Sequence, residues 1–381
     1  MIRASLLVKS FSKFFSIFIP TILIIICFVL NGCVSDCNGK STNVTSSDKT
    51  SRAEDFSVHF LGFTNNGVGD CTYINYGDID ILIDAHASST AAGPGIKNYV
   101  KDYMKDKKFE YVIVTHAHND HYTGFTGANG VFSNNYGIEI GTIIEFPKYI
   151  GTLNNDYKTA RNNAIANGAK WFTALECYNN VKEGAQRIYD FGGGVRMEIL
   201  YNYYYENDTN NENNNSICIV FHQGDDKYLF TGDLEIEGEN ELVDYYENLP
   251  LSLGKCILYK AGHHGSYTAS GDKLLNFIQP DYVMMCTCMA TAQYTSNLVN
   301  QMPSQLTLDR IAKHTDNVYI TSDRLGGGNV KPLNGNIKFK ITNGQPTVTG
   351  SNNSLKLKDQ TSFLSWIENS NGARKMPNEW K

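Results

Sequence analysis

Four side chains able to bind metal lie within the run His116-Ala-His118-Asn-Asp120-His121. The run follows the apolar stretch 111–115, which is typical of a buried strand. Two imidazoles at alternate positions can bind one metal ion, while the following carboxylate and imidazole point toward a second position nearby. A solvated polar loop is the alternative, but histidine is rare and its clustering here favours an ordered metal site. The pattern indicates the metal chemistry of hydrolases.

Two later segments carry groups that can complete such a site. Asp233 follows the apolar stretch 228–232, and its two carboxylate oxygens can bridge two metal ions. A turn-capping role is the alternative for an aspartate at a strand end. His263 and His264 lie between glycines, where core positions are unusual. Because adjacent side chains do not normally face one ion, we expect one of these two histidines to bind metal.

Alternating strand-like and helix-like segments must position these groups. Strands are predicted over 56–63, 71–76, 79–84, 111–115, 140–146, 195–205, 217–221, 227–231, 256–259, 282–288, 318–321, 337–341 and 346–348. Helices are predicted over 96–104, 156–166, 235–246, 274–278 and 306–314. The tract 206–215 is almost wholly Asn, Asp and Glu, which predicts an exposed loop. Each candidate ligand segment follows a strand, where a rigid sheet edge can hold side chains in fixed directions.

The first residues predict export and anchoring. Basic residues precede the apolar run 14–30, which ends in Leu30-Asn-Gly-Cys33. This order resembles a bacterial lipoprotein signal, which implies cleavage after residue 32 and a lipid anchor on Cys33. An uncleaved signal-anchor helix is the alternative, although the run is short for a membrane span. In either case we expect the catalytic part at the extracytoplasmic face of the bacterial cell membrane.

Composition divides the rest of the chain. Residues 33–55 are polar and predict a flexible tether, residues 56–350 form the predicted hydrolase domain, and residues 351–381 form a polar C-terminal tail. Of 381 residues, 41 % are hydrophobic and 19 % charged, an ordinary balance for a globular protein. The formal net charge of -6 argues weakly against long-range attraction of nucleic acid or anionic lipid.

Nine cysteines do not predict a disulfide framework. Cys27 lies in the signal and Cys33 is the expected lipid site, which leaves an odd number of thiols. The remaining cysteines are widely spaced, and Cys71, Cys218 and Cys256 lie in apolar runs. This distribution favours buried free thiols.

The order of these motifs resembles the metallo-β-lactamase superfamily over residues 57–345. The motifs most similar to the hydrolase domain of ComEC-type competence proteins are Gly67-Val-Gly-Asp70, Ile81-Leu-Ile-Asp84, Asn215-Ser216, Thr231-Gly-Asp-Leu-Glu235 and His263-His-Gly-Ser266. Phosphorylcholine esterases share much of this pattern. The resemblance implies an α/β (α+β) fold, an αββα sandwich of two mixed sheets flanked by helices, with zinc ions at one edge of the sheets.

The resemblance also implies a set of metal ligands. The first metal would be bound by His116 and His118, the second by Asp120, His121 and His264, and both by the bridging Asp233. We prefer His264 to His263 because the last ligand of the superfamily commonly stands directly before glycine. Two zinc ions are expected, although these donors also accept manganese or iron.

Three further residues are expected to support the ligands. His263 would contact the substrate or leaving group, with Glu235 holding its ring. Asp84 would orient a metal-binding side chain from the end of its strand.

Many superfamily members have another histidine before the bridging aspartate, but His222 lies inside a predicted strand here. The first metal is therefore expected to keep an open position, which suits water and phosphate oxygens.

These observations predict a membrane-anchored, extracytoplasmic, metal-dependent hydrolase. Zinc lowers the pKa of bound water from about 15.7 toward 7, which gives a hydroxide nucleophile near neutral pH. Asp120 would orient that nucleophile, and His263 would donate a hydrogen bond or proton to the leaving group. The resemblance to ComEC-type domains favours phosphoester or phosphodiester bonds over amides.

The substrate class and two alternatives stay open at this point. Extracellular nucleic acid or a phosphorylated envelope polymer would suit the predicted location, and no protein partner is inferred. No multi-helix membrane channel accompanies the motifs, so we do not expect DNA uptake to carry over from the competence proteins. One alternative is a β-lactamase or other amide or ester hydrolase. The other is a surface lipoprotein that binds metal without turnover.

Overall fold

The computed structural model of the chain describes residues 55–62, 68–86, 92–249, 253–291 and 295–381. The predicted signal peptide, the lipid site Cys33 and nearly all of the tether lie outside the described residues. Within those ranges, the helices are all too short or too polar to cross a membrane.

The first sheet is mixed, with eight strands in the order β16-β15-β1-β2-β3-β4-β5-β6. Its strands are β1 Ser57–Phe60, β2 Thr72–Tyr76, β3 Ile79–Ile83, β4 Lys108–Val114, β5 Glu139–Glu145, β6 Lys170–Thr173, β15 Ile337–Thr342 and β16 Gln345–Gly350. Strands β3 to β6 run parallel, so their carboxyl ends meet at one edge. The loops after β3 and β4 therefore emerge side by side.

The second sheet also has eight strands, in the order β14-β13-β12-β11-β10-β9-β8-β7. Its strands are β7 Ile188–Asp190, β8 Val195–Ile199, β9 Ile219–Gln223, β10 Asp226–Phe230, β11 Leu258–Lys260, β12 Tyr282–Met289, β13 Val318–Asp323 and β14 Lys331–Pro332. Strands β10 to β13 run parallel. The segments that carry Asp233 and the two adjacent histidines therefore also leave one sheet edge together.

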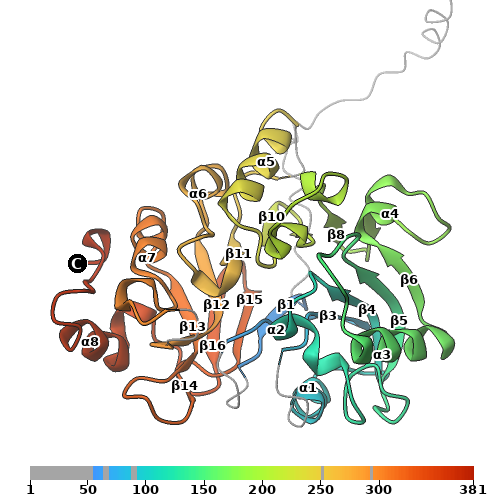
Figure 1. The fold of residues 1–381 in the computed structure, drawn as a ribbon, viewed down its shortest axis with the longest axis horizontal. Helices are drawn as coiled ribbons and strands as arrows, with labels where there is room; N and C mark the ends of the chain where they lie inside the picture. The colour runs from blue at the N-terminus through green and yellow to red at the C-terminus, as the bar shows by residue number, and fades with distance from the viewer. Residues whose placement is uncertain (1–54, 63–67, 87–91, 250–252, 292–294) are drawn as a thin grey trace, which may run out of the picture. The chain divides into compact units, whose positions relative to one another are not determined.

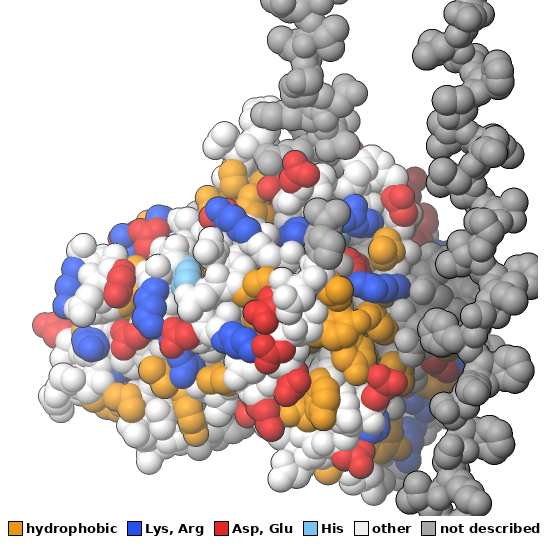
Figure 2. Space-filling model, turned by 90° about the horizontal axis from the view of Figure 1, so that it is seen from above, with side chains coloured by type: hydrophobic (Ala, Val, Ile, Leu, Met, Phe, Trp, Pro, Cys, Tyr) orange, Lys and Arg blue, Asp and Glu red, His pale blue; other side chains and the backbone are white. Residues whose placement is uncertain are grey.

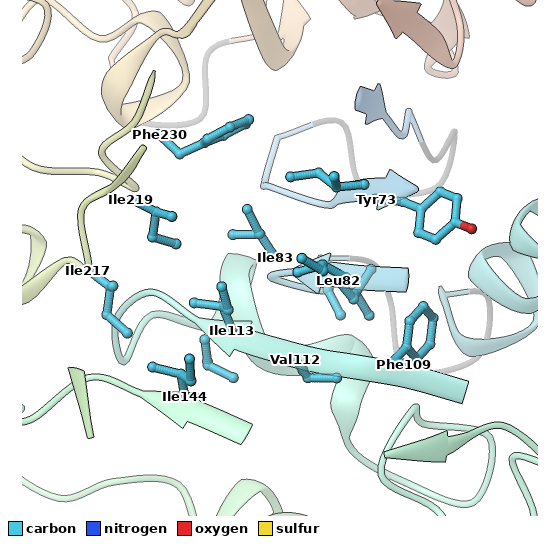
Figure 3. Close-up of a cluster of buried hydrophobic side chains, with 14 of the residues drawn as sticks. Tyr73, Leu82, Ile83, Phe109, Val112, Ile113, Ile144, Ile217, Ile219 and Phe230 are labelled. Atoms are coloured by element: carbon cyan, nitrogen blue, oxygen red, sulfur yellow. The ribbon is translucent and has the colours of Figure 1, made fainter. Parts of the chain in front are cut away.

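Apolar and aromatic side chains join the two sheets. The ring centroids of Phe56 and Tyr228 lie 4.9 Å apart, and those of Phe60 and Phe230 lie 6.2 Å apart. Figure 3 shows Ile83 and Ile113 among the buried side chains of this cluster. Branched and aromatic residues fit the pleated, buried surface of such strands. The core between the sheets therefore holds the two ligand-bearing edges in fixed positions.

Helices cover the outer faces of both sheets (Figure 1). Helices α1 Ala92–Val100, α3 Asn155–Ala166 and α4 Ala174–Asn179 pack with the core of the first sheet. Helices α5 Ile236–Tyr246, α6 Asp272–Ile278, α7 Gln305–Ala312 and α8 Thr361–Glu368 cover the second sheet. This arrangement of two mixed sheets between helices confirms the predicted αββα architecture.

The C-terminal residues are not the polar tail that the sequence suggested. Phe363, Trp366 and Trp380 are buried in the apolar cluster under the second sheet. The buried Arg374 guanidinium lies 3.6 Å from the Trp366 ring centroid and donates a hydrogen bond of 2.7 Å to the Pro303 carbonyl. Sparse aromatic residues among polar ones hid this packing from the sequence pattern. The segment is part of the folded domain.

Short helical turns occupy several connections. They are α2 Asn119–Tyr122 and the 3-10 turns Thr123–Phe125, Tyr203–Tyr205, Glu212–Asn215, Gly262–Gly265, Leu298–Asn300, Leu357–Asp359 and Asn378–Trp380. The strand predicted over 195–205 ends at Ile199, since Asn202 accepts a hydrogen bond from the backbone N–H of Tyr204 and caps the next turn.

Charge is distributed without a continuous basic area on the face shown in Figure 2. There, Lys and Arg side chains are interspersed with Asp and Glu, and hydrophobic side chains gather to one side. This distribution agrees with the negative net charge of the sequence. Polyanion binding by a broad positive surface is not supported on this face.

Candidate metal centre

The predicted ligand segments meet at the carboxyl ends of parallel strands in both sheets. The first sheet supplies the segment after β4, and the second supplies the segments after β10 and β11. The participating side chains are largely buried: His116, His121 and His264 are inaccessible to solvent, and Asp233 is 1 % exposed. Buried charged groups are normally paired with opposite charges or bound to a metal ion, so this buried cluster of histidines and carboxylates is a candidate metal site.

Four atoms define what we call the second metal position. His264 Nε2 lies 3.1 Å from Asp233 Oδ2 and 3.3 Å from Asp120 Oδ2. His121 Nε2 lies 3.2 Å from Asp233 Oδ2 and 3.3 Å from His264 Nε2. Zinc bonds of about 2.0–2.1 Å in a tetrahedron require donor atoms roughly 3.3 Å apart. The donor set therefore fits a tetrahedral metal ion.

Two carboxylates orient the imidazoles of this position from behind. Asp84 Oδ2 lies 2.7 Å from His121 Nδ1, and Asp84 also accepts hydrogen bonds from the N–H and hydroxyl of Thr115. Asp70 Oδ1 lies 3.1 Å from His264 Nδ1. Each carboxylate holds the Nδ1 side of a ring and leaves Nε2 to face the shared centre. The sequence motifs included Asp70 but assigned it no role.

The pKa directions show that this cluster prefers a cation. Burial opposes the charged form of His121 and His264, but attraction to Asp233 raises the pKa of both well above the usual value. Burial also opposes the charged form of Asp120, yet His264 and His121 hold its pKa below the usual range. A metal ion at the centre would take the place of these protons, so metal binding should release protons.

The first metal position has fewer protein donors. His116 Nε2 lies 3.0 Å from His118 Nδ1, and 4.0 Å from Asp233 Oδ2. His222 lies elsewhere in β9, where its Nε2 is 3.4 Å from Glu198, so it has a structural role. Two imidazoles and one carboxylate oxygen leave room for water or substrate oxygens.

The two carboxylate oxygens of Asp233 have different neighbours. Asp233 Oδ2 lies 4.0 Å from His116 Nε2, 3.2 Å from His121 Nε2 and 3.1 Å from His264 Nε2. Asp233 Oδ1 lies 3.8 Å from Lys260 Nζ and has no hydrogen-bond partner among the described residues. Asp233 is thus placed between the two predicted metal positions, as a bridging carboxylate requires. Gly232 before it has φ 55°, and a Cβ there would lie 2.9 Å from Ser216 Oγ. Glycine is thus favoured directly before Asp233 at this turn.

His263 lies at the rim of the centre. Its Nδ1 is 3.2 Å from Glu235 Oε1 and 3.0 Å from Thr268 Oγ1, and its Nε2 is 4.0 Å from Asp233 Oδ2. Burial opposes ionisation of Glu235, but hydrogen bonds from His263 and Asn213 lower its pKa. His263 and His264 both have positive φ, 44° and 54°. This strained turn lets adjacent rings approach one centre from different sides.

Two supporting residues were missed by the sequence analysis. Glu212 lies in the tract predicted as an exposed loop, yet its carboxylate accepts hydrogen bonds from the N–H groups of Ala117 and Ile150. Lys260 ends β11, is 2 % exposed and forms an ion pair with Asp70. A lysine inside an apolar run directly before the histidine loop was the available signal for the second residue.

The six described cysteines outside this centre are free and buried, which confirms the prediction of buried thiols for them. Burial raises the pKa of Cys218 above its usual range. These thiols are therefore core side chains.

Comparisons with known proteins found a family and several similar proteins. The model of the metallo-beta-lactamase superfamily matches residues 64–153 and 209–288. ComE operon protein 3 of Bacillus subtilis is 34% identical over 73 residues, which are 19% of this chain and 9% of that protein. Competence protein ComA of Neisseria gonorrhoeae is 28% identical over 150 residues, 39% of this chain and 20% of that protein. The metallo-beta-lactamase fold protein YhfI of Bacillus subtilis is 13% identical with a TM-score of 0.37, covering 68% of this chain and 80% of that one.

Proposed function

Because this chain belongs to the metallo-β-lactamase superfamily, we propose that it is an extracytoplasmic, membrane-anchored hydrolase of phosphoester or phosphodiester bonds. The observation that carries the proposal is the tetrahedral donor set around Asp233 Oδ2, beside a first position with fewer donors. A site that only stored metal would have no need of an open position.

Bound divalent metals would supply a water of lowered pKa and positive charge near the bond to be cleaved. The protein's own groups determine orientation. Asp120 would help to hold that water in place from the second metal position, where its Oδ2 lies 3.3 Å from His264 Nε2. His263, held at Nδ1 by Glu235, presents Nε2 at the rim, where it can donate to the leaving oxygen. Zinc is the expected metal, and manganese or iron would also suit these donors.

Two observations support the preference for phosphorus esters. The first metal position leaves room for substrate oxygens, and a phosphoryl group has several of them. The second is the similarity to the two competence proteins, which covers a small part of each, so that their activities are only proposed for this chain. Extracellular nucleic acid and phosphorylated envelope polymers are the substrate classes that we propose.

The full chain, purified in detergent, tests the reaction. We expect two metal ions per chain and cleavage of bis-p-nitrophenyl phosphate or p-nitrophenyl phosphorylcholine. Asp120→Asn should abolish most of this turnover, whereas Asp102→Asn on an exposed position should not. Cleavage of nitrocefin alone would replace the phosphoesterase proposal with a β-lactamase. Metal binding without turnover of any of the three would leave a binding lipoprotein.

The proposed anchor has its own test. Substituting Cys33→Ala removes the thiol that would carry the lipid, so the protein should move from the membrane fraction to the soluble fraction. Unchanged membrane retention would favour an uncleaved signal-anchor helix instead.

A further inference from the structure

Lys260 brings a buried ammonium group to the metal centre. The side chain ends β11 and is inaccessible apart from 2 % of its surface. Its Nζ forms an ion pair with Asp70, lies 3.8 Å from Asp233 Oδ1 and donates a hydrogen bond of 3.1 Å to the Gly232 carbonyl. Lys260 thus contacts the carboxylate that orients His264 and faces the one that joins the two metal positions.

The neighbourhood of this ammonium has the composition of a metal site. Asp70, His121, Asp233 and His264 each offer an atom within 4.8 Å of the others, and all four are buried. Asp70 nevertheless lies on the Nδ1 side of His264, away from the Nε2 that faces the second metal position. The ion pair with Lys260 already compensates Asp70. Of these four residues, Asp70 is therefore the one that forms an ion pair with Lys260 and does not bind the metal.

We propose that Lys260 is a fixed internal cation of the metal centre, which compensates Asp70 and Asp233 in the metal-free protein and lowers the affinity of the second metal position. The inference rests on the proposed metal-dependent function, because it concerns the same donors.

Electrostatics determines that Lys260 weakens metal binding and does not strengthen it. A positive charge held beside Asp233 repels a divalent ion bound at the other oxygen of the same carboxylate. The same charge removes repulsion between buried carboxylates when no metal is present, which favours the metal-free state. Both effects weaken metal binding. At the effective dielectric of a buried site, together they correspond to a change in affinity of roughly tenfold to a hundredfold.

The experiment compares Lys260→Met with the native full chain by Zn²⁺ titration against a competing chelator and by thermal unfolding. We expect Lys260→Met to bind its second Zn²⁺ at least tenfold more tightly. Its metal-free form should unfold at lower temperature, so that the rise in Tm on adding Zn²⁺ is larger than in the native protein. Lys255→Met is the matched control, since Lys255 pairs with Asp281 at the surface and lies outside the centre.

Two further variants separate charge from packing. Asp70→Asn combined with Lys260→Met removes one charge of each sign and also the carboxylate that orients His264, so the second-site affinity should fall from that of Lys260→Met to the native value or below it. Lys260→Arg keeps the positive charge, and its affinity should stay within about threefold of the native protein. These variants also test the inference if Lys260→Met alone fails to fold.

Two results of the Lys260→Met experiment would contradict the inference. An equal fall in Tm with and without Zn²⁺ would mean that Lys260 only packs, and weaker Zn²⁺ binding in Lys260→Met would mean that it only positions donors. Either outcome overturns the inference. If the native chain binds two metals and cleaves phosphodiesters while Lys260→Met shows native affinity, only this inference fails. If the native chain binds metal without turnover, the proposed function fails and the affinity comparison still decides the role of Lys260.

Discussion

The backbone N–H of Ala117 donates a hydrogen bond of 3.0 Å to Glu212 Oε1. Ala117 stands between the two imidazoles of the first metal position, so this bond fixes the peptide that spaces them. The other oxygen of Glu212 accepts hydrogen bonds from the N–H of Ile150 and from Asn215 Nδ2. One carboxylate therefore joins three loops around the open side of the centre.

Glu212→Gln should weaken the first metal position. The amide keeps one acceptor oxygen but replaces the other with a donor, which cannot accept from a backbone N–H. We expect about a tenfold loss of affinity at this position, as for other residues that support metal ligands. Zn²⁺ titration measures the effect, with the exposed Glu183→Gln as control. Native affinity in Glu212→Gln would show that the loop holds its shape without the carboxylate.

Asp84→Asn should weaken the second position. Asp84 Oδ2 is 2.7 Å from His121 Nδ1, and losing its charge makes the ring a poorer and less fixed ligand. We expect a loss of metal affinity of about 10–100-fold, seen as one tightly bound metal where the native chain holds two. Asp78→Asn at the exposed ion pair with Lys105 is the control. Two equally tight metals in Asp84→Asn would contradict the orienting role.

His263→Ala and His264→Ala should separate turnover from metal binding. His264 Nε2 faces two carboxylates of the second position, so removing it should release that metal. His263 is held by Glu235 at the rim, so removing it should leave both metals bound and reduce turnover by about 10²–10⁴-fold. Metal content and hydrolysis are measured on the same samples. Loss of a metal from His263→Ala would reassign that residue as a ligand.

Glu239→Gln should change how stability depends on pH. The buried Glu239 carboxylate accepts hydrogen bonds from the N–H groups of Ser270 and Gly271, and burial raises its pKa to about 7. A raised pKa means that its contribution is complete below the unfolded value, near 4.5, and is lost as pH rises through about 7. Gln is neutral like the protonated form, but its amide nitrogen cannot accept from one of the two N–H groups, which lowers the stability of the variant at every pH. The stability of the variant relative to the native protein should therefore rise between pH 5 and pH 8 by up to about 3 kcal/mol.

Urea unfolding at pH 5 and pH 8 checks this expectation, since the variant should be the less stable protein at pH 5 and should lose this disadvantage as the pH rises to 8. Glu241→Gln, on the exposed side of the same helix α5, should show no such pH dependence. A native-like pH profile in Glu239→Gln would mean that this carboxyl does not titrate in that range.

Trp366→Ala should destabilise the whole domain. The indole is 4 % exposed in the core under the second sheet and lies against the Arg374 guanidinium. Truncating a buried tryptophan costs about 3–5 kcal/mol. Leu364→Ala on the same helix removes a side chain that is 46% exposed and should change stability by less than about 0.5 kcal/mol. If both variants unfolded at the same urea concentration, the C-terminal segment would not be part of the cooperative unit.

The sequence predicted most strands and the ligand loops because both follow local rules, whereas the two-sheet architecture came from the family resemblance. Apolar runs identified the strands, and loops at strand ends hold side chains in fixed directions. The contacts of Glu212 could not be predicted in this way, because its tract has the composition of an exposed loop. Its partners Ala117 and Ile150 come from segments far away in the chain. Composition describes solvent preference and cannot identify such partners.

Backbone conformation at the histidine pair could not be predicted from the sequence. Adjacent side chains ordinarily point apart, which predicted that one of His263 and His264 binds metal. In the structure His264 Nε2 lies 3.1 Å and His263 Nε2 4.0 Å from Asp233 Oδ2, and the positive φ at both residues has no signal in the sequence pattern. Lys260 shows a similar limit, since its role depends on Asp70 and Asp233 from other loops.

The pairing of β1 with β15 makes the first sheet depend on contacts between distant segments. Strand β1 lies inside this sheet with Ser57 opposite Lys340, so its second neighbour comes from a segment far along the chain. Contacts between such distant segments form slowly, because a long loop must close first. The first sheet therefore cannot be completed before residues 337–342 have been synthesised and have reached β1.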